Sequence, residues 1–429
     1  MNKKAFQPIL ASLVCILAGM LVGFVIMLIL SLSSAYTDVG DAFRGLWKII
    51  IGPFGSGNAK MIKMDVGNMI FYSVPLIFTG LSVAIAFKTG LFNIGAPGQY
   101  LMGTMGSLLV ALNIHAKSGF GQFAVWFLAL VVGFLSGALW GAIPGIFKSI
   151  LKVNEVIVCI MTNWIAANVV TWVFSQSGLQ NVGMGKTAYL VTTSTTGAST
   201  PTLGLDKIFK GSYIDCGIII AVIFAVGIYV LLNKTTFGYE LKACGYNKNA
   251  SIYAGMNAKR NVVLSMAIAG GLSGIGGALY YLNPGIEFNY LSVYMTLPAT
   301  GFNGIPVALL ANSNPLGVIF SGILLQYLSM GGQYLQGIGF NRYIADIIVA
   351  IIIYFAGFAR LIIEIIQNVK GKNADKADKI DKSTKKDNAF ITFIKGVVNK
   401  ITVRKTNDKN DSLKEESDVK ADQKEANNE

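Results

Sequence analysis

The chain has 429 residues, of which 53% are hydrophobic and only 13% are charged, and its mean hydropathy is +0.57. A water-soluble globular protein carries about 25% charged residues, so this composition excludes that class and indicates an integral membrane protein. The formal net charge of +13 is explained by Lys and Arg in loops beside a membrane, without any need for nucleic-acid binding.

The apolar runs predict an all-α integral membrane protein with about ten transmembrane helices. We place these spans at residues 9–32, 69–87, 98–114, 121–147, 155–174, 214–232, 262–282, 296–311, 314–330 and 343–366. The short polar stretch 312–315 marks the junction of the eighth and ninth spans, so residues 296–330 are either two spans or a re-entrant hairpin.

The chain divides by composition into four parts. Residues 1–33 contain an apolar run longer than the core of a signal peptide and predict a retained first helix, although the small residues Ser33, Ser34 and Ala35 would also allow cleavage. Residues 34–68 form an extracytoplasmic segment, and residues 69–369 form the transmembrane domain. Residues 370–429 are a charged, mostly disordered cytoplasmic tail. Within the tail, residues 389–403 have the spacing of an amphipathic helix that either lies on the inner leaflet or forms only weakly.

Glycines recur at four-residue spacing in the fourth span, at Gly133, Gly137, Gly141 and Gly145. This spacing places a glycine ridge on one face of the helix, where a neighbouring helix can pack backbone to backbone. The ridge predicts close helix packing and carries no information about a substrate.

Two breaks in the apolar runs hold polar residues at membrane depth. The first, residues 92–99, contains Asn93 and Gln99, and the second, residues 301–306, contains Phe302 and Asn303. Broken helices are tolerated at this depth only where protein or water satisfies the backbone. Amide side chains can hydrogen-bond the hydroxyl groups of a neutral solute and Phe can stack on a ring, so we predict that these residues line a substrate pathway.

The fifth span begins with Glu155, and Cys159, Asn163 and Ala167 follow it on the same helical face. This stripe has two readings. Glu155 and Asn163 can face a polar pathway, because polar side chains inside lipid usually face protein or water. Alternatively, Glu155 is a helix-start acid at the membrane interface, and the asparagine binds a neighbouring helix.

Residues 233–261 form a net basic loop between two spans, which places it in the cytoplasm together with both chain termini. The loop has the start and stop signals of two short helices. Gly245 is expected to close the first in a left-handed turn, Asn247 to cap the start of the second, and Gly255 to end it. The small residues Ala243 and Ala250 would let another surface come close. The loop is either a docking element for a partner or an ordinary cytoplasmic loop.

Four stretches together resemble a known family. They read GLSVAIAFKTGLFNIGAPGQYLMG, VNEVIVCIMTNWIA, FGYELKACGYNKNASIYAGM and GFNGIPVALL, in this order along the chain. They are similar to the ABC-importer permeases for ribose, simple sugars and nucleosides, and most similar to the nucleoside branch. The resemblance covers roughly residues 65–360. Pro97 stands where an acidic residue is usual in the family, and Asn303 stands where Asp is common.

The resemblance implies that residues 233–261 are the coupling loop that contacts an ABC ATPase. The family motif maps onto Gly238, Glu240, Ala243, Gly245, Asn247, Ala250 and Gly255. It also implies a second permease subunit, identical or different, and an extracytoplasmic substrate-binding lipoprotein.

We therefore predict a multi-pass permease of a bacterial cytoplasmic membrane that imports nucleosides by alternating access. The alternatives are a permease of the same class for ribose or another simple sugar, and an ion-coupled secondary transporter. The chain is not expected to be an enzyme or to hold a cofactor or a metal. Its one Gly-Lys-Thr, residues 185–187, is preceded by Gln180 where a phosphate-binding loop needs Gly. ATP is expected to bind the partner subunit.

Overall fold

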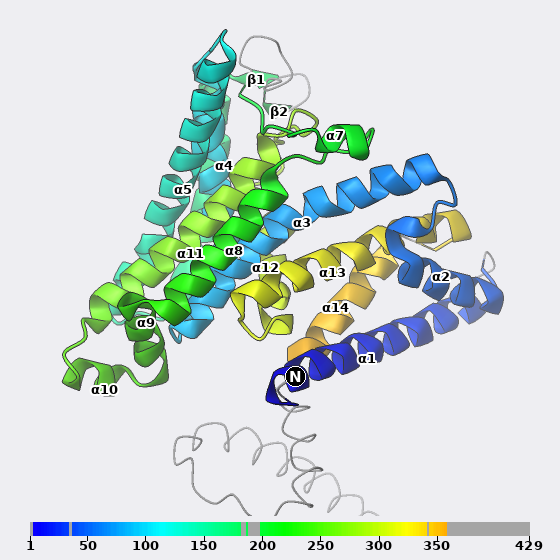
Figure 1. The fold of residues 1–429 in the computed structure, drawn as a ribbon, viewed down its shortest axis with the longest axis horizontal. Helices are drawn as coiled ribbons and strands as arrows, with labels where there is room; N and C mark the ends of the chain where they lie inside the picture. Colours follow the sequence, from blue (N-terminus) through cyan, green and yellow to red (C-terminus); the bar gives the residue numbers. More distant parts are fainter. Residues whose placement is uncertain (1–2, 34–36, 182–185, 188–197, 341–342, 358–429) are drawn as a thin grey trace, which may run out of the picture. The chain divides into compact units, whose positions relative to one another are not determined.

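The computed structural model describes residues 3–33, 37–181, 186–187, 198–340 and 343–357 (Figure 1). Within these residues the fold is almost entirely α-helical. The β structure among them is one antiparallel pair of two-residue strands, β1 (Gln180–Asn181) and β2 (Lys186–Thr187), in which Gln180 pairs with Thr187. The predicted amphipathic helix at residues 389–403 lies outside the described residues.

Each of the ten predicted spans overlaps a helix, and residues 358–366 of the last predicted span lie outside the described residues. These helices are α1 (Lys3–Ser33), α3 (Ala59–Lys88), α4 (Ala96–Asn113), α5 (Gly119–Ser149), α6 (Glu155–Gln176), α8 (Gly217–Lys234), α11 (Ala258–Tyr281), α12 (Ala299–Leu310), α13 (Pro315–Gln333) and α14 (Tyr343–Gly357). Seven helices of the described chain, namely α1, α3, α5, α6, α8, α11 and α13 with the 3₁₀ turn η2 (Tyr334–Ile338), are long and apolar enough to cross a membrane. The protein is thus an all-α integral membrane protein.

The segment predicted as extracytoplasmic, residues 34–68, contains helical structure that hydropathy did not indicate. Helix α2 (Val39–Ile51) starts at a reciprocal cap, in which the Asp41 amide donates to the Asp38 side chain at 2.8 Å and the Asp38 amide donates to the Asp41 side chain at 3.0 Å. The 3₁₀ turn η1 (Gly52–Phe54) follows. Helix α3 then begins at Ala59, ten residues before the predicted start, because Asn58 caps it by accepting from the Lys60 amide.

Residues 296–330 contain two helices, α12 and α13, joined by a turn with left-handed backbone at Asn312 and Ser313. Helix α12 has 12 residues and is therefore about 18 Å long, too short to cross a hydrocarbon core of about 30 Å. The Ser321 hydroxyl on α13 donates to the Val307 carbonyl on α12 at 2.8 Å, which holds the two helices together.

The glycine ridge of α5 packs against α11, as its spacing predicts. A Cβ on Gly274 would lie 2.5 Å from the Gly133 carbonyl oxygen, and one on Gly141 would lie 2.9 Å from the Gly270 Cα. Helices α3 and α11 are mostly buried, whereas α5 and α8 expose large apolar side chains such as Leu139 and Ile223. The exposed faces are the ones suited to lipid, since the neighbours in a membrane are apolar.

Two short helices, α9 (Thr236–Tyr246) and α10 (Lys248–Tyr253), connect α8 to α11. Figure 1 shows them at one end of the helix bundle, with the strands β1 and β2 and the short helix α7 (Leu205–Ile208) at the other. The predicted coupling loop thus lies at the end of the bundle opposite the described parts of the connection between α6 and α8.

Candidate functional site

The predicted pathway residues Asn93 and Gln99 form a closed hydrogen-bond network at the break between α3 and α4. The Asn93 amide donates to the Gln99 carbonyl oxygen at 2.7 Å, and the Gln99 amide donates back to Asn93 at 3.0 Å. Asn93 also donates to the Ser82 hydroxyl at 2.9 Å and accepts from the Gly95 amide at 3.1 Å. Asn93 and Gln99 are 0% and 1% exposed, so these bonds satisfy the polar groups that the break leaves in a buried position.

Asn163, on α6, completes this network from the other side. Its side-chain oxygen accepts from the Gly98 amide at 2.8 Å, and its side-chain nitrogen donates to the Ile94 carbonyl at 2.9 Å. Gly98 is required here, since a Cβ at this position would lie 2.8 Å from the Asn163 oxygen. Asn163 thus fastens α6 to the first turn of α4. Pro97 is the second residue of α4, where a missing N–H costs nothing because the first amides of a helix have no intrahelical partner.

Glu155 lies apart from this network, in the first turn of α6. Its carboxylate forms an ion pair with Lys148 at the end of α5, at 2.6 Å, and the Glu155 side chain is largely buried. Asn154 caps the helix by accepting from the Val156 amide. In this structure the acid therefore joins the ends of α5 and α6, and its assignment to the pathway stays a prediction.

Phe302 and Asn303 are neighbours on α12 but line different cavities. Half-buried Phe302 contributes to a cavity of about 350 Å³ between α6 and α12, and Asn163 lies on its wall. The other residues around it are Ile160, Trp164, Met295, Thr296 and Leu297. This cavity is mostly apolar and offers a ring-stacking surface at Trp164 and Phe302.

Exposed Asn303 faces a second cavity, of about 140 Å³, between α3, α11, α12, α13 and α14. The polar side chains on its wall are Tyr72, Tyr280, Thr300, Asn303, Gln326, Ser329 and Asp346. Sequence reasoning missed all of them except Asn303. One signal was present: Asp346 is an ionisable residue inside the predicted last span, which is by itself a reason to look for a functional site.

The predicted coupling loop has the two short helices expected from its caps, with one correction. Asn247 caps α10 by accepting from the Ala250 amide at 3.1 Å, and Gly255 has the left-handed φ of +80° that ends the turn. Gly245 does not close the first helix, because α9 continues through Tyr246 and the φ of Gly245 is not positive.

Gly245 is instead required by a close contact between α9 and the end of α3. A Cβ at Gly245 would lie 2.6 Å from the Lys88 carbonyl oxygen and 2.9 Å from the Gly90 nitrogen. Gly238 is similar, since a Cβ there would lie 2.6 Å from the Leu232 Cα of α8. These two glycines thus position α9 against its own chain, and their small size is not evidence for a partner.

Glu240 connects α9 to the start of α11. Its carboxylate accepts from the Asn261 amide at 2.9 Å and lies 3.6 Å from the Arg260 guanidinium. Beside it is an open groove of about 510 Å³, lined by Thr236, Tyr239, Glu240, Ala254, Gly255, Met256, Asn257 and Arg260. Ala243 is half-buried and Ala250 is exposed, and their small side chains protrude little from α9 and α10. Tyr246 and Tyr253 on the same helices are 91% and 93% exposed. This end of the bundle offers a groove lined in part by Tyr239, and two exposed tyrosines on the same pair of helices.

Comparison with known proteins identifies the family. Residues 66–357 match the family described as Branched-chain amino acid transport system / permease component. The nucleoside ABC transporter permease protein NupB of Lactococcus lactis is 33% identical over 368 residues, covering 85% of this chain and 94% of NupB. The guanosine ABC transporter permease protein NupP of Bacillus subtilis is 35% identical over 353 residues, covering 82% of this chain and 94% of NupP.

A further permease protein of Lactococcus lactis, NupC, is 28% identical over 279 residues, covering 63% of this chain and 84% of NupC. No solved structure matches the chain. The family match spans α3 to α14 and includes the polar break, the two cavities and the helices α9 and α10. This chain therefore belongs to the family of transport-system permease components, as a multi-pass membrane subunit of an ABC transporter.

Proposed function

We propose that this chain is the permease subunit of an ATP-driven importer that carries nucleosides across a bacterial cytoplasmic membrane. The observation that carries the proposal is the similarity to two permeases named for nucleosides and guanosine, at 33% and 35% identity over 94% of each. The four sequence motifs fall inside this similarity. The family description mentions branched-chain amino acids, which makes leucine a necessary comparison in any transport test.

The energy source in this proposal is a separate ABC ATPase that binds ATP and contacts α9 and α10. The groove beside Glu240 and the exposed rings of Tyr246 and Tyr253 support this docking surface, because exposed aromatic residues are typical of interface hot spots. The Gly-Lys-Thr at residues 185–187 lacks the glycine pattern of a nucleotide loop. Both termini then lie in the cytoplasm with the coupling loop, and the chain itself needs no cofactor.

A continuous set of contacts leads from α9 toward the polar break. The backbone of α9 at Gly245 lies against Gly90, at the end of α3. The Thr89 hydroxyl bonds the Ser265 hydroxyl on α11, and the break that holds Asn93 follows directly. A displacement of α9 by the ATPase would therefore move the α3–α4 junction, which is the coupling that alternating access requires.

A second permease subunit completes the pathway in this proposal. Two proteins of Lactococcus lactis named as nucleoside ABC transporter permeases, NupB and NupC, are both similar to this chain. This pairing supports a different second permease beside this chain. An extracytoplasmic binding lipoprotein would deliver the solute at the end of the bundle opposite α9 and α10.

Uptake in a strain that lacks the gene tests the function. The strain with the gene restored should take up labelled adenosine and guanosine, and neither labelled ribose nor labelled leucine at a comparable rate. If the strain takes up ribose and no nucleoside, the substrate is a simple sugar and the assignment of a nucleoside is wrong. Accumulation by the purified chain in liposomes without ATP or partner subunits would indicate an ion-coupled carrier and would end the proposal of an ATP-driven importer.

A further inference from the structure

The cavity between α3, α11, α12, α13 and α14 differs from every other polar site described above in one respect. The side chains of Asn303, Gln326, Ser329 and Asp346 line it, and within the described residues none of them has a hydrogen-bond or ion-pair partner. The Asn93 network, in contrast, pairs its amide groups with one another. Hydrogen-bonding capacity is therefore unused in this cavity, where a solute can take it up.

Asn303 and Asp346 are exposed and Gln326 and Ser329 are half-buried, so the cavity opens to the surface of this chain. Within a membrane, polar groups without a partner are costly unless water or a polar ligand satisfies them. Asp346 is the strongest case, because an ionised carboxylate in contact with lipid is particularly unfavourable. It lies on α14, and Asn303 and Gln326 approach the same cavity from α12 and α13. Three separate helices thus bring acceptors and donors to one place.

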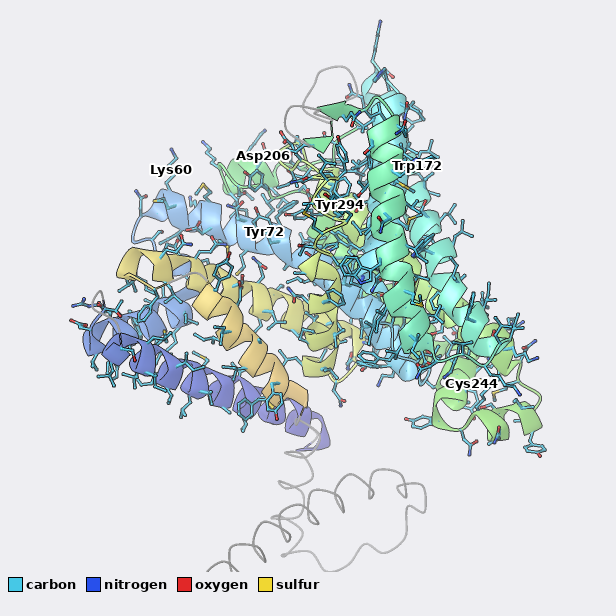
Figure 2. All side chains as sticks on the ribbon, turned by 180° about the vertical axis from the view of Figure 1, so that it is seen from behind. Lys60, Tyr72, Trp172, Asp206, Cys244 and Tyr294 are labelled. Carbon is cyan, nitrogen blue, oxygen red and sulfur yellow. The ribbon has the colours of Figure 1, made fainter. Side chains whose placement is uncertain are left out.

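Two aromatic rings close the other side of the cavity. Tyr72 on α3, labelled in Figure 2, and Tyr280 on α11 have ring centroids 6.1 Å apart at 46°. Tyr280 is itself stacked on Phe71, at 5.5 Å and 21°. A planar ligand between the two tyrosines would need about 9 Å, from two stacking distances of at least about 4.5 Å each. A ligand ring can therefore stack on this pair from the cavity side and cannot be sandwiched.

We propose that this cavity is the binding site for a nucleoside in transit through the membrane, an inference that rests on the proposed function. The base lies against Tyr72 and Tyr280, and the ribose hydroxyls donate to Asp346. This assignment follows from the chemistry of the groups. An ionised carboxylate only accepts hydrogen bonds and matches hydroxyl donors, whereas Asn303 and Gln326 both donate and accept, as the edge of a base requires.

In this structure the cavity is smaller than a whole nucleoside requires. About 140 Å³ is less than the roughly 300 Å³ at the lower end of small-molecule pockets. The site has to widen to admit a whole nucleoside. Alternating access provides this change, because α3 leads directly into the junction that contacts α9.

The test uses the full transporter in proteoliposomes with ATP and a constant amount of binding protein. Tyr72→Ala should lower uptake of adenosine at saturating concentration by about tenfold, whereas Tyr72→Phe, which keeps the ring, should retain most of it. Asp346→Asn should lower uptake of adenosine by about tenfold, and uptake of 2′,3′-dideoxyadenosine much less. The matched controls are Tyr294→Ala and Asp206→Asn, which alter residues outside the cavity that are labelled in Figure 2.

The ratio of adenosine to dideoxyadenosine uptake is measured within one protein, so a partly misfolded variant cannot change it. If Asp346→Asn lowers both substrates in parallel, or if Tyr72→Ala transports at the normal rate, the cavity is not the nucleoside site. That result leaves the proposed function intact, provided the wild-type transporter carries nucleosides. A wild-type transporter that carries none contradicts both proposals.

Discussion

The side-chain amides of Asn93 and Gln99 exchange two hydrogen bonds, at 2.7 and 3.0 Å, between the end of α3 and the first turn of α4. These two residues interrupt an apolar sequence, and the structure shows how the interruption is tolerated. The Asn93 and Gln99 side chains and the Gly95 and Gly98 amides find partners on the break itself, on Ser82, or on α6. The pair is part of a rigid joint in this conformation.

Loss of Asn93 should therefore destabilise the fold directly. Asn93→Leu leaves the Gln99 amide, the Ser82 hydroxyl and the Gly95 amide without their partner, and each unsatisfied buried group costs about 1–3 kcal/mol. We expect a clear fall in the thermal unfolding midpoint of the detergent-purified protein. Asn168→Leu is the control, since among the described residues the side chain of exposed Asn168 bonds only the Trp164 carbonyl of its own helix. Equal unfolding midpoints for Asn93→Leu and Asn168→Leu would show that the hydrogen bonds of Asn93 do not stabilise the fold.

Helix positions could be predicted from the sequence because apolar length and caps are local properties. The span at 155–174 begins at the helix start, Glu155, and Asn247 caps α10 as expected. The predicted start of α3 was ten residues too late. Lys60, Lys63 and Asp65 lower the hydropathy of the first turns of this helix without ending it. Hydropathy indicates which part of a helix lies in lipid, whereas the helix itself can begin in water before the membrane.

The candidate site was harder to predict because it depends on contacts between distant residues. Nothing local distinguishes Gly245 as a helix terminator from Gly245 as a contact with Gly90, and the structure shows the second. The cavity at Asn303 unites residues between Tyr72 and Asp346 from five helices. The spacing rules for one helix cannot bring these residues together, although Asp346 alone was a visible signal.

The contact between α5 and α11 should depend on the absence of side chains. Gly274→Val places its Cβ 2.5 Å from the Gly133 carbonyl oxygen and forces the helices apart. Overpacking of this kind costs about 1–3 kcal/mol or more. Less folded protein should be recovered from membranes, and its unfolding midpoint should fall. Gly227→Val on α8 is the matched control, because nothing lies within 4 Å of a Cβ there. An equal loss in both would mean that valine itself, and not the contact, is harmful.

Docking of the ATPase should depend on Tyr246 and Tyr253. Both rings are almost fully exposed, so alanine at either position removes no intramolecular packing. Truncation of an aromatic hot spot costs about 2 kcal/mol or more of binding, so we expect at least a tenfold weaker association with the ATPase and unchanged thermal unfolding. Co-purification of the ATPase with the permease measures this.

Tyr294→Ala, far along the bundle from α9 (Figure 2), should leave the ATPase bound. Gly245→Asp is a less specific test of docking. If Gly245 contacts the ATPase, this variant should insert normally into the membrane but lose transport. The new Cβ already meets the Lys88 carbonyl oxygen, so such a loss would report a displaced α9 equally well. Normal co-purification of the ATPase with the Tyr246→Ala, Tyr253→Ala double variant would place the docking surface elsewhere.

Stability should depend on pH through Asp215, which precedes α8. Its carboxylate accepts from the Gly217 amide and the Asn283 side chain, both at 2.8 Å, but is only 2% exposed. Burial outweighs these bonds and raises the pKa of Asp215 from 3.8 to about 6. The folded state therefore keeps a proton that the unfolded chain has released between about pH 4 and pH 6.

The sign of the effect follows from this difference. The contribution of Asp215 to stability is fully present below about pH 4, falls as the pH rises to about 6, and is constant above that. Its size is at most about 3 kcal/mol, from about 1.4 kcal/mol for each pH unit between the two pKa values. In Asp215→Asn, the unfolding midpoint should lose this downward slope, whereas Asp206→Asn at an exposed position should retain it. A slope that persists unchanged in Asp215→Asn would show that another group titrates, because asparagine has no proton to release in this range.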